Sequence, residues 1–281
     1  MNDHAISRRV FAGTSLVAGF TLAAGPLRAG AIITNANGLV AGEVRVPVSD
    51  GAIPAWRAHP ATGAHWPVVL VTQEIFGVHE HIKDICRRFA KVGCYAIAPS
   101  LYARQGDPGR YTDIHKLVAE IVSKVPDAEV MSDLDAAARF AGHEGADAAR
   151  LSIIGFCWGG RIVWLYAAHD PALKAAAAFY GPLRAPSPRS PLRPFYPLDL
   201  AQKIDAPVIA FYGGKDDGIP VSDVEDMRAE LAKAGKRDCR INVFMDTGHG
   251  FFADYRHSYN EADAKLAWLR TLDWFRAHRA I

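Results

Sequence analysis

The sequence contains a short glycine-flanked turn that is suited to hold a nucleophile. Cys157 lies in Gly155-Phe156-Cys157-Trp158-Gly159, directly after the apolar stretch 151–154. This Gly-x-Cys-x-Gly spacing is typical of a sharp turn from a strand into a helix, where any side chain at the glycine positions would clash. The N-terminus of the following helix favours the thiolate form of the cysteine. Taken alone, Cys157 could equally be a buried and inert thiol.

Two segments further along the chain supply the base and the acid that such a nucleophile needs. Asp216 and Asp217 follow the apolar stretch 207–212, and His249 follows the stretch 240–245 between two glycines. The carboxyl ends of parallel strands meet at one edge of a sheet, so these side chains should gather near Cys157. Of the eleven histidines, His249 alone has this order and context. The residues leave open which aspartate points inward.

Five segments together resemble the dienelactone hydrolase family, the carboxymethylenebutenolidases. They occur in the family's order and span roughly residues 40 to 278. The matching segments are 71–78 (VTQEIFGV), 99–104 (PSLYAR), 155–160 (GFCWGG), 213–220 (GGKDDGIP) and 248–251 (GHGF). The resemblance implies an α/β-hydrolase fold and the hydrolysis of a small ester or lactone. We expect no cofactor, and no two cysteines have the CxxC spacing typical of a zinc site.

The same resemblance assigns catalytic roles. It implies that Cys157 is the nucleophile and that His249 is the base. Asp216 would orient the histidine, because it aligns with the family aspartate once the double glycine is matched. Glu74 would influence the ionisation of the thiol.

Further roles concern the oxyanion hole and the substrate. The backbone N–H groups of Trp158 and Ile75 would stabilise the oxyanion. Arg104 would bind a substrate carboxylate, a task that suits a planar and permanently charged guanidinium. The remaining predicted substrate contacts are aromatic, namely Phe76, Tyr102 and Phe251.

One position departs from the family pattern and leaves the substrate open. The family has a second arginine a few residues after the catalytic histidine, where this chain has Ala253. Arg256 and Arg184 are candidates to replace it. An esterase or thioesterase acting on a non-lactone substrate is therefore an alternative within the same fold. A non-catalytic, thiol-sensing binding protein is an alternative from another class, which the complete triad disfavours.

The choice of sulfur also restricts the substrate. A thiolate attacks readily, but it leaves a tetrahedral intermediate more easily than an alkoxide does. The intermediate therefore expels the enzyme unless the substrate has a good leaving group of its own. Enol esters, enol lactones, aryl esters and thioesters meet this condition, so we expect activated acyl substrates.

The N-terminal residues resemble an export signal. Ser7-Arg8-Arg9-Val10-Phe11 is a twin-arginine signature, and an uncharged stretch, 12–24, follows it. Ala29-Gly30-Ala31 offers a cleavage site. The apolar run is too short to remain as a membrane span. We therefore predict that residues 1–31 are a signal for the twin-arginine (Tat) export machinery, and that the mature enzyme works in the periplasm or outside the cell.

The rest of the chain, residues 32–281, indicates a single α/β domain. A hairpin over 40–57 precedes strands near 67–72, 94–98, 151–155, 174–180, 207–212 and 239–245, which are separated by helical stretches. This alternation predicts a doubly wound, mostly parallel sheet. The net charge of +2, with both signs scattered, indicates no nucleic-acid or membrane partner. We expect a monomer, and a Cys86–Cys94 disulfide stays open.

Overall fold

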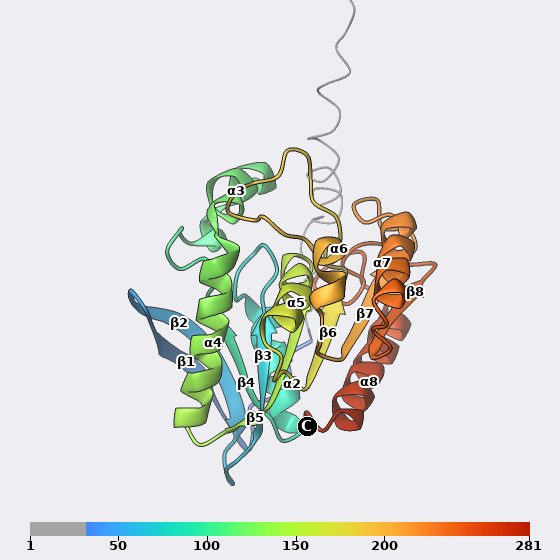
Figure 1. Ribbon diagram of the computed structural model, residues 1–281. Helices are drawn as coiled ribbons and strands as arrows, with labels where there is room; N and C mark the ends of the chain where they lie inside the picture. Colours follow the sequence, from blue (N-terminus) through green and yellow to red (C-terminus); the bar gives the residue numbers. More distant parts are fainter. Residues whose placement is uncertain (1–31) are drawn as a thin grey trace, which may run out of the picture.

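The computed structural model describes residues 32–281, so the predicted export signal lies outside the described part of the chain. One sheet runs in the order β1-β2-β4-β3-β5-β6-β7-β8 (Figure 1). Strands β3 to β8 are parallel, whereas β2 runs antiparallel to both β1 and β4. The predicted α/β-hydrolase fold with an antiparallel hairpin at its start is confirmed. The strands are β1 (Leu39–Val48), β2 (Gly51–Pro60), β3 (Pro67–Thr72), β4 (Tyr95–Pro99), β5 (Asp147–Phe156), β6 (Ala175–Phe179), β7 (Val208–Gly213) and β8 (Cys239–Phe244).

Helices on both faces explain the composition of the central strands. Every residue of β3, β4, β6 and β7 is buried, because parallel strands with crossover helices are covered on both sides. Their sequences are accordingly continuous apolar runs, such as AAAAF in β6. The outer strand β1 instead mixes exposed and half-buried positions.

The helices form a layer on each face of the sheet. Phe89 of α2 contacts Trp268 and Phe275 of α8, with ring centroids 4.8 Å and 5.9 Å apart. On the other face, which is nearer the viewer in Figure 1, Tyr166 of α5 donates to Asp135 of α4. No helix among residues 32–281 is both long enough and apolar enough to cross a membrane. The helices are α2 (Glu80–Lys91), α3 (Ile114–Glu120), α4 (Asp127–His143), α5 (Trp158–His169), α6 (Pro197–Leu200), α7 (Val221–Lys233) and α8 (Glu261–Ala277), with 3-10 turns at Pro108–Arg110, Val122–Lys124 and Ala201–Lys203.

The strand order determines where a site can form. From β3 the chain crosses to β4 on one side, whereas β5 to β8 succeed one another on the other side. In sheets of this kind, ligands bind outside the carboxyl ends of the strands near such a reversal. Every residue of the predicted triad follows the carboxyl end of a parallel strand, Cys157 after β5, Asp216 after β7 and His249 after β8.

The proline-rich stretch 181–196 is an extended segment between β6 and α6. A buried ion pair between Arg161 of α5 and Asp127 of α4 lies beside it, with Nη2 2.7 Å from Oδ2. The same guanidinium also donates to the carbonyl of Phe195 and therefore holds the segment in place. Cys86 and Cys94 are both buried and free, so the disulfide that the sequence left open is not formed.

Candidate active site

The predicted strand-to-helix turn is present between β5 and α5. Cys157 caps α5 with φ 55° and ψ −118°, a backbone conformation that side-chain-bearing residues rarely adopt. A Cβ atom at Gly155 would lie 1.8 Å from the Thr72 hydroxyl oxygen, and one at Gly159 would lie 2.4 Å from the Gln73 carbonyl oxygen. Both glycines are therefore required by the close approach of β3.

Hydrogen bonds fix the position of the turn. The N–H of Cys157 donates to the carbonyl of Phe179 at the end of β6, over 3.0 Å. The hydroxyl of Thr72 lies 3.0 Å and 3.1 Å from the carbonyls of Ile154 and Gly159 and links β3 to both sides of the turn. Cys157 itself is buried. The cysteine is thus placed at a strained and rigidly supported position.

Asp216 and His249 form a buried hydrogen-bonded pair. Asp216 Oδ2 accepts from His249 Nδ1 over 2.7 Å, while Oδ1 accepts the backbone N–H groups of Gly218 and Ile219. Asp217 is exposed, which settles the ambiguity between the adjacent aspartates. Burial opposes protonation of His249, but the negative charges of Asp216 and Cys157, which both also hydrogen-bond the ring, raise its pKa to about 10. This environment favours the imidazolium form of His249.

Glu74 lies at the centre of a second buried group. Its Oε2 accepts a short hydrogen bond from the Tyr255 hydroxyl and lies 3.3 Å from His79 Nε2. Its Oε1 lies 3.4 Å from Arg256 Nη2. Burial alone would raise the pKa of Glu74, but the charge of Arg256 and the hydrogen bond from His79 hold it well below its usual range. Glu74 is therefore an ionised carboxylate, fully buried.

The two predicted oxyanion donors lie on segments that touch each other. Trp158 is the first residue of α5, and Ile75 is in the tight turn where Glu74 bridges Gly77. The packing of Gly159 against the Gln73 carbonyl brings this turn against the first turn of α5. The segment that carries Ile75 therefore packs on the same turn as Trp158, as an oxyanion hole formed by these two residues would require.

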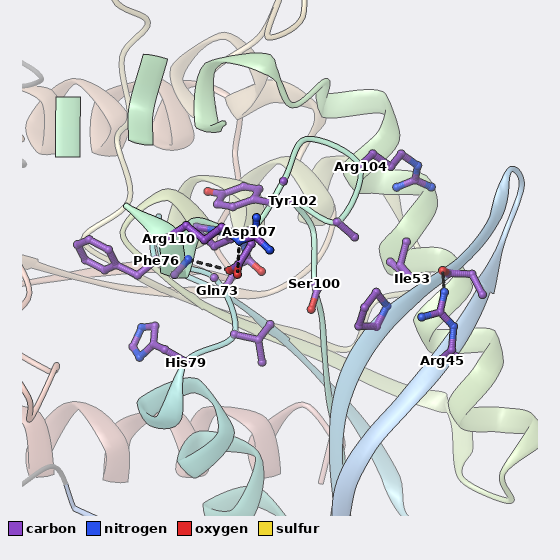
Figure 2. A pocket seen from close by; sticks show the side chains of 18 of the residues that line it. Arg45, Ile53, Gln73, Phe76, His79, Ser100, Tyr102, Arg104, Asp107 and Arg110 are labelled. Carbon is purple, nitrogen blue, oxygen red and sulfur yellow. Dashed lines mark hydrogen bonds and ion pairs between the residues drawn. The ribbon is translucent and has the colours of Figure 1, made fainter. Parts of the chain in front are cut away.

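A cavity of about 800 Å³ opens beside these residues (Figure 2). Phe76 and Tyr102, both predicted to contact substrate, line it, and Gln73 and His79 extend the same wall. Tyr102 packs edge-on against Trp158, with ring centroids 4.9 Å apart, and so joins the cavity to the nucleophile turn. These contacts place the cavity next to the expected acyl site.

Phe251 has a different environment from the one predicted. It is fully buried and packs against Tyr180 and Phe244, at centroid distances of 5.5 Å and 5.2 Å. It does not line the cavity. An apolar residue next to a catalytic loop can support that loop from below, and the sequence does not distinguish this role from a substrate contact.

Arg104 is also placed differently from the prediction of a carboxylate clamp. It lines the cavity, but its guanidinium bonds Asp50 at 2.7 Å and Asp133 at 2.8 Å, with Glu129 3.6 Å away. Its donors are therefore committed to carboxylates of the protein. The clamp was an implication of the family resemblance, whereas the structure pairs Arg104 with Asp133, which is far away in sequence and lies on the neighbouring helix α4.

The two arginines considered as replacements for the family arginine differ in their burial and in their partners. Arg184 is on the surface, bound to Asp223 and Asp226. Arg256 is buried and reaches Glu74, although Ala253, at the position of the family arginine, is itself buried. A cation is thus supplied to Glu74 by a residue three positions further along the same loop.

Sequence reasoning did not identify three neighbours of the site. Tyr255 and His79 both contact Glu74, and the ring of Tyr180 lies 5.0 Å from that of His249. The position of His79, five residues after Glu74 at the start of α2, was the available signal, because a chain that turns back after a strand brings such residues together. Among residues 32–281 no three His, Cys, Asp or Glu side chains are arranged to hold a metal ion.

The protein has the defining features of an α/β-hydrolase. These are the sheet topology, the strained turn after β5, and the acid and the histidine that follow β7 and β8. The model of the dienelactone hydrolase family matches residues 53–279, and the chain belongs to this family. It is accordingly a hydrolase that acts on ester or lactone bonds.

Several relatives share most of the chain's length. A Methylorubrum extorquens protein assigned as a carboxymethylenebutenolidase is 56% identical over 275 residues, which cover 97% of this chain and 94% of that protein. An Escherichia coli K12 protein with the same assignment is 48% identical over 94% of this chain and 97% of its own. The crystal structure of a Klebsiella pneumoniae protein assigned as a dienelactone hydrolase is 51% identical, with a TM-score of 0.82 over 85% of this chain and 98% of that one.

Proposed function

We propose that the protein hydrolyses small activated esters or lactones through a thioester formed on Cys157. The observation that carries this proposal is the hydrogen-bonded Asp216–His249 pair, which lies against a buried cysteine at the strained turn. A Cys157 thiolate beside a His249 imidazolium is ready to attack without a preceding proton transfer.

The steps follow from this arrangement. The thiolate sulfur attacks the acyl carbon, and the carbonyl oxygen takes negative charge at the N–H groups of Trp158 and Ile75. The C–O bond then breaks, and His249 gives its Nε2 proton to the departing oxygen. In the second half His249 takes a proton from water, the hydroxyl oxygen attacks the thioester carbon, and the thiolate leaves with the C–S electron pair. Asp216 keeps the histidine in the required orientation throughout.

The substrate is a small molecule with a good leaving group. The thiolate leaves more readily than an alkoxide, so plain alkyl esters return to starting material, whereas aryl and enol esters proceed. The cavity of about 800 Å³ is large enough for a compact ester or lactone. We infer that Phe76 and Tyr102 contact its apolar part.

The experiment compares activated and plain substrates with the matched nucleophile variant. Wild-type protein should hydrolyse an aryl ester, an enol lactone and an acyl thioester much faster than ethyl acetate. Cys157→Ala should abolish all of this turnover, and Cys157→Ser should retain at most a weak activity. Full activity in Cys157→Ala, with an unchanged far-ultraviolet circular dichroism spectrum, would contradict the proposed nucleophile.

We further propose that the enzyme is exported by the twin-arginine machinery and acts in the periplasm or outside the cell. The support is the Arg8-Arg9 pair with its uncharged stretch, 12–24. In cell fractionation, the wild-type protein should be found outside the cytoplasm, and the Arg8→Lys, Arg9→Lys variant should stay in the cytoplasm. Equal distribution of the two proteins would refute export by this route.

A further inference from the structure

Tyr180 places a buried hydroxyl group beside the catalytic histidine. Its ring lies edge-on to that of His249, with centroids 5.0 Å apart, and its side chain is fully buried. No protein group in residues 32–281 hydrogen-bonds this hydroxyl. A buried polar atom without a protein partner costs stability, so the hydroxyl is positioned for a ligand rather than for the fold.

The backbone holds Tyr180 at a fixed place relative to the nucleophile. Tyr180 directly follows β6, and the carbonyl of Phe179, the last residue of that strand, accepts the N–H of Cys157 over 3.0 Å. The N–H of Tyr180 donates to the carbonyl of Phe211 on β7 over 2.8 Å. Its φ of 37° lies in the left-handed region, which a tyrosine rarely adopts. The ring also packs edge-on against Phe251, with centroids 5.5 Å apart, so the side chain is held in one orientation.

The hydroxyl lies outside the cavity that is suited to the substrate. Gln73, Phe76 and Tyr102 line that cavity (Figure 2), whereas Tyr180 is not among its lining residues. A fully buried group outside the substrate cavity has room only for a very small ligand. Water is such a ligand, and it is the reactant that the second half of the proposed reaction requires. A buried water needs at least two polar partners, and the Tyr180 hydroxyl and His249 Nε2 are suitable ones.

The surroundings keep this hydroxyl protonated. Burial, followed by the charge of Glu74, raises the pKa of Tyr180 well above its ordinary 10, and the charge of Cys157 acts in the same direction. A neutral phenol both donates and accepts hydrogen bonds. Tyr180 is therefore suited to orient a water molecule without exchanging a proton with it.

We propose that Tyr180 is a positioning residue for hydrolysis of the acyl-enzyme, and that its hydroxyl binds the water that attacks the thioester. His249 Nε2 takes one proton of this water, and the Tyr180 oxygen accepts a hydrogen bond from the other. The water oxygen forms the new C–O bond to the acyl carbon. The C–S bond then breaks, and the sulfur of Cys157 leaves as a thiolate with the electron pair. This inference rests on the proposed function and adds a residue that acts only in its second half.

The test measures the two halves of the reaction separately in Tyr180→Phe, which removes only the hydroxyl group. Enzyme in excess is mixed with p-nitrophenyl acetate, so that each molecule reacts at most once. Release of p-nitrophenolate measures acylation, and mass spectrometry of acid-quenched samples follows the loss of the acetyl group from Cys157. Release should stay within about twofold of wild type, whereas loss of the acetyl group should be roughly 10–100-fold slower, because the water loses a hydrogen bond and its orientation.

Tyr166→Phe is the matched control. Tyr166 is also buried, but its hydroxyl donates to Asp135 in the outer layer of helices, so both rates should equal those of wild type. Thermal unfolding verifies the fold of each variant. Tyr180→Leu serves the same purpose if the phenylalanine variant fails to fold.

Hydroxylamine provides a second measurement that a purely structural role would not affect. It is a stronger nucleophile than water and attacks a thioester without assistance from the protein. It should therefore remove the acetyl group from wild type and from Tyr180→Phe at similar rates. A displaced or distorted acyl group in Tyr180→Phe would instead react more slowly with hydroxylamine as well, and this result would contradict the proposal.

Two further outcomes would overturn the proposal. Equal slowing of acylation and deacylation in Tyr180→Phe would show that the tyrosine acts by packing against His249, which serves both halves. Loss of the acetyl group as fast as in wild type would show that the hydroxyl has no role. If neither protein carries an acetyl group on Cys157 although p-nitrophenolate is released, the proposed thioester mechanism itself is refuted, and this inference with it.

Discussion

The replacement of Asp216 by asparagine tests how the histidine is oriented. One carboxylate oxygen accepts the N–H groups of Gly218 and Ile219, at 2.9 Å and 3.1 Å, and the other accepts His249 Nδ1. In Asp216→Asn the amide oxygen must stay with the two backbone donors, so the NH₂ group faces the ring. His249 Nδ1 then has to accept, and the proton moves to Nε2, which faces Cys157.

The size of the effect follows from these contacts. A flipped amide would give up two backbone hydrogen bonds, at about 1 kcal/mol each, and would place NH₂ against N–H donors, so the flip does not rescue the variant. The wrong tautomer cannot receive a proton from water or thiol, and the stabilising charge on the imidazolium is lost. We expect kcat/KM to fall about 10²–10⁴-fold, or roughly 3–5 kcal/mol of transition-state stabilisation.

The assay is steady-state hydrolysis of an aryl ester at pH 7.5, with thermal unfolding to verify the fold. Asp217→Asn is the matched control, because the exposed Asp217 is adjacent in sequence, and it should retain nearly full activity. A large loss in Asp217→Asn together with a small loss in Asp216→Asn would refute this account of the triad.

Three further predictions concern stability. Arg104→Ala leaves Asp133, which is 1% exposed, without its cation, so urea unfolding should show a loss of about 2–3 kcal/mol. The ratio of kcat/KM for an acidic and a neutral aryl ester should stay the same as in wild type, and a large fall in this ratio would contradict a purely structural role. Gly159→Ala forces a methyl group to 2.4 Å from the Gln73 carbonyl and should abolish soluble, active protein, whereas Gly42→Ala, with open space around it, should not. The pKa of His249 is raised from 6.5 to about 10 on folding. The stabilisation of the folded state by protonated His249 is therefore complete below pH 6.5 and is lost as the pH rises through 10. The free energy of unfolding should fall over this range in wild type and less so in His249→Gln; equal slopes would refute the linkage.

Local patterns were sufficient to predict the fold and the positions of the triad residues. The Gly-x-Cys-x-Gly turn demands close backbone approach at two fixed positions, and continuous apolar strands require helices on both faces. His249 could be placed because it follows such a strand, whereas the choice of Asp216 over Asp217 came from the family resemblance. These features depend on contiguous residues, which the sequence displays directly.

The errors and omissions concern contacts between distant segments. The family resemblance implied that Arg104 binds substrate, and nothing near it in sequence reveals its partner Asp133 on α4. Arg256 was only one of two candidates, and the donation from Tyr255 to Glu74 was not foreseen, since 181 residues separate the pair. Side-chain partners of this kind depend on how the loops above the sheet fold over one another, which has no periodic signature.

During turnover Cys157 should carry the acyl group of the substrate as a thioester, and mass spectrometry can detect this intermediate. Wild-type protein is mixed with an excess of an aryl ester, quenched in acid within the first turnovers and digested with protease. We expect a peptide containing Cys157 whose mass has increased by that of the acyl group, and no such peptide from Cys157→Ala. An acyl group found on another residue, or continuing turnover with Cys157 never modified, would contradict the account.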